Sequence, residues 1–204
     1  AKSDKAPLGV LFLFALDEFR HCGSLIVDKQ YGTNNTFLVG LMGAGKTTIG
    51  RSLAKRLELM FVDSDREIEA RTGVSIPTVF DIEGEEGFRR RESEVIAQLS
   101  KQSAQVVATG GGAVLRPENR VNMRDGGFVV YLNVPPAILW ERTRHDRNRP
   151  LLQVDDPLLK LQELYAVRDP LYREVADLVI DGGRVSAQSV LQLIAEEFEQ
   201  RWKR

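Results

Sequence analysis

The stretch that decides the fold is Thr36-Phe37-Leu38-Val39, followed directly by Gly40-Leu41-Met42-Gly43-Ala44-Gly45-Lys46-Thr47. The first four residues are β-branched or apolar, as in a buried strand, and the next eight match the pattern G-x-x-x-x-G-K-[S/T]. Glycines permit a tight loop with positive φ, in which consecutive backbone N–H groups point inward at the start of a helix. The sequence therefore predicts a strand, an anion-binding loop and a helix over 46–57.

The loop also carries side chains that suit a nucleotide. Lys46 would place a positive charge beside the β- and γ-phosphates, and the Thr47 hydroxyl would ligate Mg²⁺. An ordinary glycine-rich turn would not need lysine and threonine at these two places, so we favour phosphate binding. The nucleotide-binding residues expected in and after the loop are Gly43, Ala44, Gly45, Lys46, Thr47 and Thr48.

From residue 36 onward, short apolar runs alternate with stretches of helical spacing. Such alternation is typical of a parallel sheet with helices on its faces. The further expected strands span residues 60–62, 105–108, 128–132 and 178–180, and the clearest further helices span 92–99 and 190–202. We therefore expect an α/β fold of three layers, with a five-stranded parallel sheet flanked by helices.

The composition fits a globular domain without a strong charge. The 204 residues carry 28 Lys+Arg and 29 Asp+Glu, a net charge of −1, and 43% of them are hydrophobic. Neither wholesale disorder nor a polyanion-binding protein is expected from these values. The longest apolar run, 8–16, falls short of the roughly 20 residues that span a bilayer, and a single cysteine excludes an intramolecular disulfide. We expect a cytoplasmic protein with no nucleic-acid or membrane partner.

Residues 1–35 differ from the rest of the chain. A mixed apolar stretch there runs into the turn-rich Gly32-Thr33-Asn34-Asn35, which precedes the alternating pattern. We interpret 1–35 as an N-terminal extension: a disordered tail, sequence added for expression, or an oligomerisation or docking element. Residues 36–204 contain no internal repeat and no linker, so we expect a single domain there.

Polar residues follow two further strands, at the edge where open α/β sheets bind ligands. Of the carboxylates in Asp63-Ser64-Asp65, one could hold Mg²⁺ and the other could orient or deprotonate an acceptor hydroxyl. Alternatively, Asp65 or Ser64 caps the next helix. The turn Gly110-Gly111-Gly112 would let a ligand approach the backbone closely, and the arginines at 89–91 suit a carboxylate or a phosphate.

Taken together, these segments resemble the shikimate kinase family, from residue 36 to the end of the chain. The other segments that carry the resemblance are Arg71-Thr72-Gly73 with Ile76 and Phe80, Glu83-Gly84-Glu85 through Phe88-Arg89-Arg90-Arg91-Glu92, Arg149-Pro150-Leu151-Leu152 and Arg168-Asp169-Pro170-Leu171-Tyr172. The resemblance implies a P-loop kinase fold with a mobile lid over about 142–157. It also implies ATP-dependent phosphorylation of shikimate at the 3-hydroxyl, a step toward chorismate and the aromatic amino acids, by a monomer.

The resemblance implies a role for each matching position. Asp65 would bind the ring hydroxyls and serve as the base, Asp63 would lie near Mg²⁺, and Arg89 and Arg168 would hold the shikimate carboxylate. Glu92, three residues after Arg89 on a helix, is placed to fix that guanidinium. The remaining acceptor contacts would come from Gly110, Gly111 and Gly112 and from an apolar wall of Ile76, Phe80 and Phe88.

The segment 142–150 is polar and carries four arginines, as expected for a lid over phosphates. The resemblance implies that Arg142 stacks on adenine and that Arg149 closes onto the transferring phosphoryl group. His145 reads as an exposed lid residue, because phosphoryl transfer needs positioning and charge more than a proton shuttle. The expected catalytic residues are Asp65, Lys46 and Arg149.

Other proteins with such a loop fit less well. Asp81-Ile82-Glu83-Gly84 has the D-x-x-G spacing of GTPases, but the chain has no N-K-x-D segment. A gluconate-type kinase or an adenylate kinase relative would share 40–47 without the set of Asp65, Arg89 and Arg168. The alternative from a different class is a silent nucleotide-binding module, and the intact Lys46, Thr47, Asp63, Asp65 and Arg149 argue against it.

Overall fold

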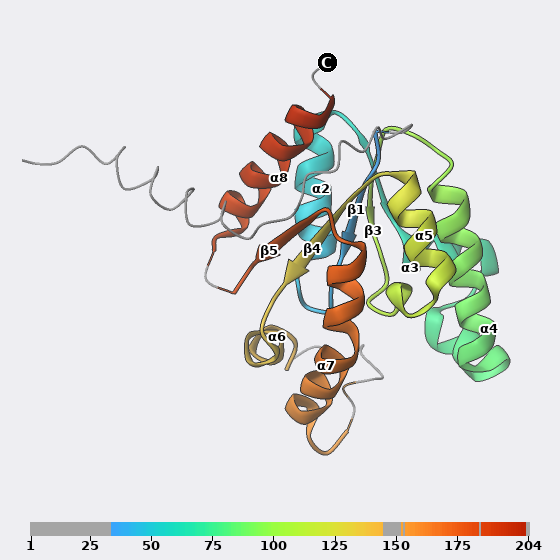
Figure 1. Ribbon diagram of the computed structural model, residues 1–204. Helices are drawn as coiled ribbons and strands as arrows, with labels where there is room; N and C mark the ends of the chain where they lie inside the picture. Colours follow the sequence, from blue (N-terminus) through green and yellow to red (C-terminus); the bar gives the residue numbers. More distant parts are fainter. Residues whose placement is uncertain (1–33, 145–151, 153, 184, 203–204) are drawn as a thin grey trace, which may run out of the picture. The chain divides into compact units, whose positions relative to one another are not determined.

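The computed structural model describes residues 34–144, 152, 154–183 and 185–202 (Figure 1). All of them belong to one compact unit, which spans 31–204. The described part of the expected extension is therefore limited to Asn34 and Asn35. The expected lid residues 145–151 and 153, including Arg149, lie outside the described residues.

A five-stranded parallel sheet forms the centre of this unit, as predicted. Its strands lie in the order β2-β3-β1-β4-β5. Their bounds are β1 (Thr36–Val39), β2 (Met60–Asp63), β3 (Gln105–Ala108), β4 (Phe128–Asn133) and β5 (Leu178–Asp181). The chain moves to one side of β1 for β2 and β3 and then to the other side for β4 and β5. The order thus reverses around β1, and open sheets bind ligands at such a point.

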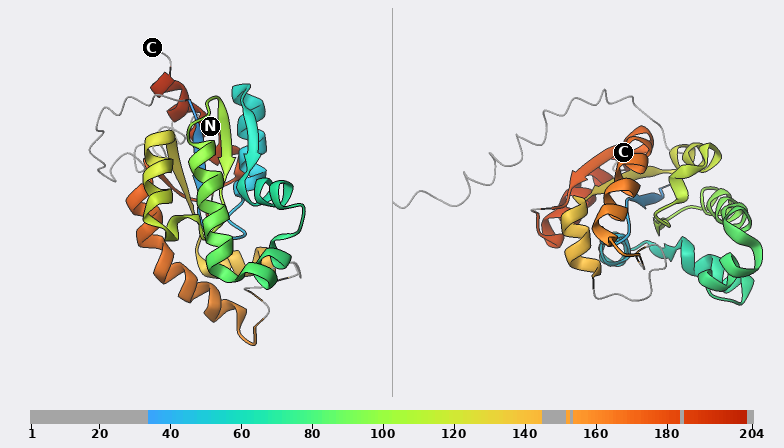
Figure 2. Two further views of the ribbon diagram at one scale, coloured as in Figure 1. Left: turned by 90° about the vertical axis from the view of Figure 1, so that its right-hand side faces the viewer. Right: turned by 90° about the horizontal axis from the view of Figure 1, so that it is seen from below.

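Helices cover both faces of the sheet (Figure 2). Helix α2 packs with α8 on one face, whereas α4, α5 and α7 pack on the other. The helix bounds are α2 (Lys46–Leu57), α3 (Ser64–Thr72), α4 (Ile76–Leu99), α5 (Pro117–Gly126), α6 (Pro136–Thr143), α7 (Pro157–Val175) and α8 (Ala187–Trp202), with a 3₁₀ turn η1 (Ala113–Leu115). The three-layer α/β architecture is confirmed.

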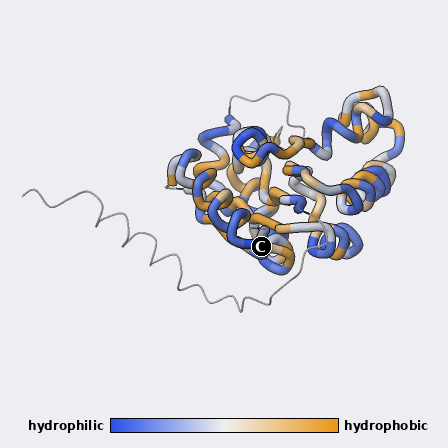
Figure 3. Tube along the Cα trace, turned by 90° about the horizontal axis from the view of Figure 1, so that it is seen from above, coloured by the Kyte–Doolittle hydropathy of each residue, from blue (hydrophilic) through white to orange (hydrophobic). Residues whose placement is uncertain are grey.

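The inner strands are buried on both faces, which explains their nearly unbroken apolar sequence. Phe37 of β1 lies between Val107 of β3 and Val129 of β4, and all three side chains are fully buried. The hydropathy colouring of Figure 3 shows apolar segments inside the ring of helices and hydrophilic ones along the outer helix faces. At the edge strand β2, by contrast, Met60 is 68% exposed.

Two asparagine side chains hydrogen-bond to backbone groups at the amino end of the sheet. The Asn35 side chain is fully buried and donates to the carbonyls of Gln102 (2.6 Å) and Gly126 (3.1 Å), while its oxygen accepts from the Gln105 N–H (3.2 Å). Asn34 accepts from the Ala104 N–H at 2.7 Å. The turn that we expected before the domain therefore ends inside it, because these amides satisfy backbone groups next to β3 and β4.

The helix predicted over 92–99 is longer than expected, since α4 begins at Ile76. Charged residues dominate its middle and obscure any apolar period. The backbone at Gly84 has φ 68° and ψ −176°, so two helical segments meet there at a kink. Residues 76–83 form the first segment and 85–99 the second.

The expected lid of about 142–157 includes helical residues at both of its ends. Arg142 and Thr143 belong to α6, and Pro157 is the first residue of α7. The Thr143 hydroxyl donates to the Leu139 carbonyl at 2.7 Å and is buried, which extends the helix through the polar sequence. No described helix is both long and apolar enough to cross a membrane.

Candidate active site

The loop between β1 and α2 has the backbone of an anion cradle. Gly43 and Gly45 adopt φ of 80° and 97°, values that a side chain disfavours. Gly43 must also stay small, because a Cβ there would lie 2.6 Å from the Thr143 methyl group. Lys46 is buried and donates to the carbonyls of Gly40 (2.7 Å) and Leu41 (2.9 Å), which holds its ammonium at the loop.

A hydroxyl and a carboxylate meet beside this loop. Thr47 Oγ1 donates to Asp63 Oδ2 at 3.0 Å, and Asp63 Oδ1 accepts from the Asp65 N–H at 3.2 Å. The residue that caps α3 is thus Asp63, and the alternative that Asp65 or Ser64 caps it is wrong. Hard oxygen ligands of this kind fit Mg²⁺, which takes one or two protein groups and completes its shell with water and phosphates. Within the described ranges, no cluster of three or more His, Cys, Asp or Glu forms a closed metal cage.

Asp65 keeps a free carboxylate oxygen next to the third-strand turn. Its buried Oδ1 has no hydrogen-bond partner and lies 2.6 Å from the place of a Cβ on Gly110. Burial, together with the nearby charges of Glu92 and Asp63, raises the pKa of Asp65 to about 6. A carboxylate with this pKa is ionised at neutral pH and can still accept a proton.

Arg89 is buried at the same turn and is fixed by its own helix. It donates to Glu92 Oε2 at 2.8 Å and to Glu85 Oε1 at 3.1 Å, which confirms the expected pairing with Glu92. The guanidinium fills the space over Gly112, where a Cβ would lie 2.2 Å from its Nη1. Burial raises the pKa of Glu92 even though Arg89 opposes that change.

Arg168 reaches the turn from α7, on the other side of the site. Its side chain is buried and donates to the Gly111 carbonyl at 3.0 Å. The turn is held from α3 as well, because the Gly110 N–H donates to Ser64 Oγ at 2.9 Å. Residues distant in sequence thus converge on Gly110–Gly112, as expected for strand ends at one sheet edge.

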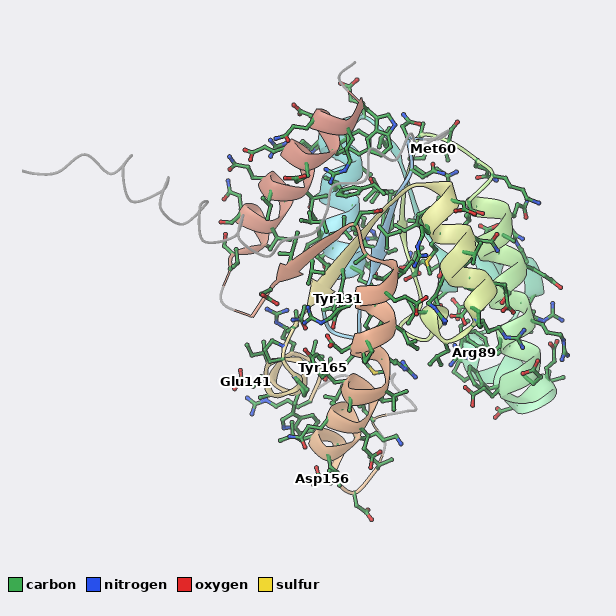
Figure 4. The ribbon with its side chains drawn as sticks, in the orientation of Figure 1. Met60, Arg89, Tyr131, Glu141, Asp156 and Tyr165 are labelled. Carbon is green, nitrogen blue, oxygen red and sulfur yellow. The ribbon has the colours of Figure 1, made fainter. Side chains whose placement is uncertain are left out.

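These groups line one pocket of about 550 Å³. Its predicted members are Asp65, Ile76, Phe80, Phe88, Arg89, Gly110, Gly111, Gly112 and Arg168, and Glu92 lines it too. Phe80 and Phe88 stack with ring centroids 4.6 Å apart, across the kink at Gly84. In Figure 4, Arg89 lies on α4 well below Met60, the first residue of β2, which marks the amino end of the sheet.

Sequence reasoning missed four further lining residues, Met42, Glu69, Pro77 and Asp81. Met42 is a variable position of the phosphate-loop pattern, so only its place in the loop could have indicated it. The other three lie on α3 and on the first segment of α4, where no spacing in the sequence separates pocket positions from solvent positions.

The remaining nucleotide-side residues lie apart from this pocket. Arg142, near the end of α6, donates to the Gly182 carbonyl at 3.5 Å, just beyond β5. Thr48 is exposed on α2. Arg142 therefore lies at the end of β5. Among the described residues, no contact of Thr48 assigns it a role.

The fold and site define a P-loop kinase that acts on a small molecule. The phosphate cradle with Lys46 and Thr47 lies beside a pocket that offers a carboxylate, two arginines and an aromatic wall. The family model described as shikimate kinase matches residues 42–199. The chain belongs to the shikimate kinase family.

Several relatives support this assignment. Shikimate kinase of Dechloromonas aromatica is 62% identical over 164 residues, which cover 80% of this chain and 90% of that protein. The Aromatoleum aromaticum enzyme is 63% identical over 147 residues, or 72% and 84% of the two chains. Among solved structures, shikimate kinase from Acinetobacter baumannii in complex with shikimate has a TM-score of 0.80 at 47% identity, covering 85% of this chain and 97% of that one.

Proposed function

We propose that this chain transfers the γ-phosphoryl group of MgATP to the 3-hydroxyl of shikimate, giving shikimate 3-phosphate and ADP. The observation that carries the proposal is the pocket beside the phosphate loop, in which Asp65, Arg89 and Arg168 face one space. Shikimate is a small cyclic polyol with one carboxylate, so it requires hydrogen-bond acceptors for its hydroxyls and cations for its acid group. The pocket offers both.

The two arginines are assigned to the acceptor carboxylate. Each guanidinium is already oriented, Arg89 by Glu92 and Arg168 by the Gly111 carbonyl, so little side-chain freedom is lost on binding. The planar fork of arginine suits two carboxylate oxygens better than a lysine would. On the other side of the ring, the wall of Ile76, Phe80 and Phe88 would exclude water and pack against carbon atoms.

Asp65 is assigned to the reacting hydroxyl. Its unpartnered oxygen lies beside Gly110, and its raised pKa of about 6 suits proton uptake from a hydroxyl during in-line attack. Lys46 would meet the charge that develops on the phosphates. Arg149, from the expected lid, would add to it on closure.

Nucleotide binding is assigned to the phosphate loop and to the side chains of Thr47 and Asp63 beside it. The backbone of Gly43, Ala44 and Gly45 would bind the phosphates, while Thr47 and Asp63 would hold Mg²⁺. When bound, Mg²⁺ would neutralise negative charge on the phosphates. Arg142 would stack on adenine near the end of β5.

The test is ADP release from MgATP by the full chain, with shikimate, gluconate or AMP as acceptor. Strong stimulation by shikimate alone is expected, because gluconate lacks the ring and AMP needs a different acceptor surface. Equal rates with all three acceptors, or stimulation by gluconate or AMP, would refute the proposal. Binding of ATP without stimulation by any acceptor would indicate a nucleotide-binding module instead.

We further propose that the enzyme works as a cytoplasmic monomer, in the route to aromatic amino acids. All the residues assigned above come from one chain, so no second copy is needed to complete the site. Light scattering of the purified protein would give a mass near 22.9 kDa. A stable mass of twice that value would contradict the monomer.

A further inference from the structure

Tyr172 is a buried tyrosine that the assignments above leave without a role. It lies one helical turn after Arg168 on α7, so both side chains leave the same face of the helix. The Tyr172 hydroxyl donates to the Gly111 carbonyl at 2.5 Å, and Arg168 donates to the same oxygen at 3.0 Å. One carbonyl oxygen therefore receives two donors from a single helix.

Gly111 is the point at which the two halves of the site meet. A Cβ built on it would lie 3.5 Å from the Met42 nitrogen, 3.6 Å from the Gly40 oxygen and 3.7 Å from Arg168 Nη1. The residue thus lies between the phosphate loop and the arginine assigned to the acceptor. It is also the middle of three glycines, whose backbone has the greatest conformational freedom of any residue type.

The Tyr172 ring is itself held in place. It is fully buried and stacks on Tyr131 with centroids 4.8 Å apart, and the Tyr131 hydroxyl donates to Asp169 at 3.0 Å. Burial raises the pKa of Tyr172, so its hydroxyl remains a donor throughout the pH range in which the enzyme would work. A fixed donor on a rigid helix can therefore define the position of a flexible glycine turn.

We propose that Tyr172 is a positioning residue for the acceptor: its hydroxyl fixes the Gly111 carbonyl, and through it the guanidinium of Arg168. The inference rests on the proposed function, because it assigns Arg168 to the acceptor carboxylate. Without the hydroxyl, the Gly111 carbonyl would lose one of the two donors described here, and Arg168, which donates to that carbonyl, would be held less firmly. We expect the cost to fall on acceptor binding, because the hydroxyl acts on Gly111 and Arg168, which line the acceptor pocket.

The test compares Tyr172→Phe with Tyr165→Phe, which removes a hydroxyl from the same helix. Tyr165 donates to Asn133 at 3.0 Å and not to Gly111, and Figure 4 shows it on α7 below Tyr131. Tyr172→Phe should raise the KM for shikimate about 10-fold, with kcat and the KM for MgATP changed by less than about 3-fold. Tyr165→Phe should leave all three parameters close to wild type.

Arg168 variants separate failure of the inference from failure of the proposed function. If Arg168→Ala weakens shikimate binding but Tyr172→Phe does not, Tyr172 has no positioning role and the proposed function stands. If neither variant affects shikimate binding, the assignment of the acceptor site itself is wrong. A Tyr172→Phe protein that fails to fold, or that loses affinity for both substrates equally, would overturn the inference in favour of a purely structural role.

A double-mutant cycle tests whether Tyr172 acts through Arg168. Arg168→Lys keeps the charge but loses the planar fork, so its loss of shikimate affinity should include part of what Tyr172→Phe removes. The combined loss should therefore be smaller than the product of the two single losses. Losses that simply multiply would show that Tyr172 does not act through Arg168.

Discussion

Asp65 combines burial with an unpartnered carboxylate oxygen, which suits chemistry more than stability. Asp65→Asn keeps the shape of the side chain but removes its capacity to accept a proton. We expect kcat to fall by at least about 10²-fold, as for loss of a general base, with the Kd for ATP nearly unchanged. Steady-state kinetics and nucleotide titration would check this. Turnover close to wild type would mean that another group accepts the proton.

The raised pKa of Asp65 also has a consequence for stability. The carboxyl titrates at 3.8 in an ordinary setting and at about 6 in the fold, so the folded state favours the protonated form. Its contribution to stability is fully present below pH 3.8 and is lost as the pH rises through about 6. Asp65→Asn should therefore stabilise the metal-free protein by on the order of 3 kcal/mol at pH 7.5.

Urea unfolding of the metal-free protein at several pH values would measure this difference. The gain of Asp65→Asn over wild type should shrink toward zero as the pH approaches 4. A gain that is independent of pH, or a variant less stable than wild type at pH 7.5, would contradict the raised pKa.

At the scale of elements, the kink in α4 sets the position of the aromatic wall. Gly84, at φ 68° and ψ −176°, adopts a conformation that essentially only glycine reaches, and a Cβ placed on it would meet no atom of the more distant described residues within 4 Å. Gly84→Ala should therefore cost about 1–3 kcal/mol of stability through backbone strain alone. It should also raise the KM for shikimate, because Phe80 and Phe88 stack across the kink.

Gly73→Ala is the matched control for this element. Gly73 also has open space around it, but its φ of 71° and ψ of 6° lie in the left-handed region, where alanine is strained by only about 1 kcal/mol. Thermal unfolding and kinetics of both variants would separate strain from function. A Gly84→Ala enzyme as stable and as active as wild type would show that the kink is not needed.

The elements also show where sequence reasoning succeeds. The phosphate loop and the inner strands were predictable, because glycine spacing and unbroken apolar runs each express a local rule. The first half of α4 was not predicted, because charged residues and two glycines separate it from the clear helical spacing at 92–99. Glu69 and Asp81 were not predicted as pocket residues, because no spacing in the sequence distinguishes pocket positions from solvent positions on these helices.

At the scale of the whole molecule, the two ends of the sheet have different roles, one in binding and the other in stability. The carboxyl ends of the strands carry the site, while the amino ends are joined by the Asn35 amide through three backbone hydrogen bonds. Asn35→Ala leaves the carbonyls of Gln102 and Gly126 and the Gln105 N–H without this partner. We expect a loss of about 2–4 kcal/mol in the free energy of unfolding, since orphaned buried groups cost about 1–3 kcal/mol each and water can satisfy some of them.

Asn35→Ala should leave KM and kcat unchanged at temperatures where the protein stays folded, because Asn35 lies far from the pocket along the strands. Denaturant unfolding and steady-state kinetics together would check this. Asn35→Asp is a useful comparison, since it keeps the acceptor but loses the donor. An alanine variant with unaltered stability, or with altered KM, would contradict the separation of the two ends.

Asn34 and Asn35 determine where the chain can be shortened for laboratory work. Anyone who shortens the chain for crystallisation, or joins a purification tag to it, should cut ahead of Asn34 rather than at the start of β1. A version that starts at residue 36 would begin with Thr36, whose strand is fully buried, and would lack the amides that cover the neighbouring backbone. Poor yield from such a version would reflect the choice of cut and not an intrinsically weak fold.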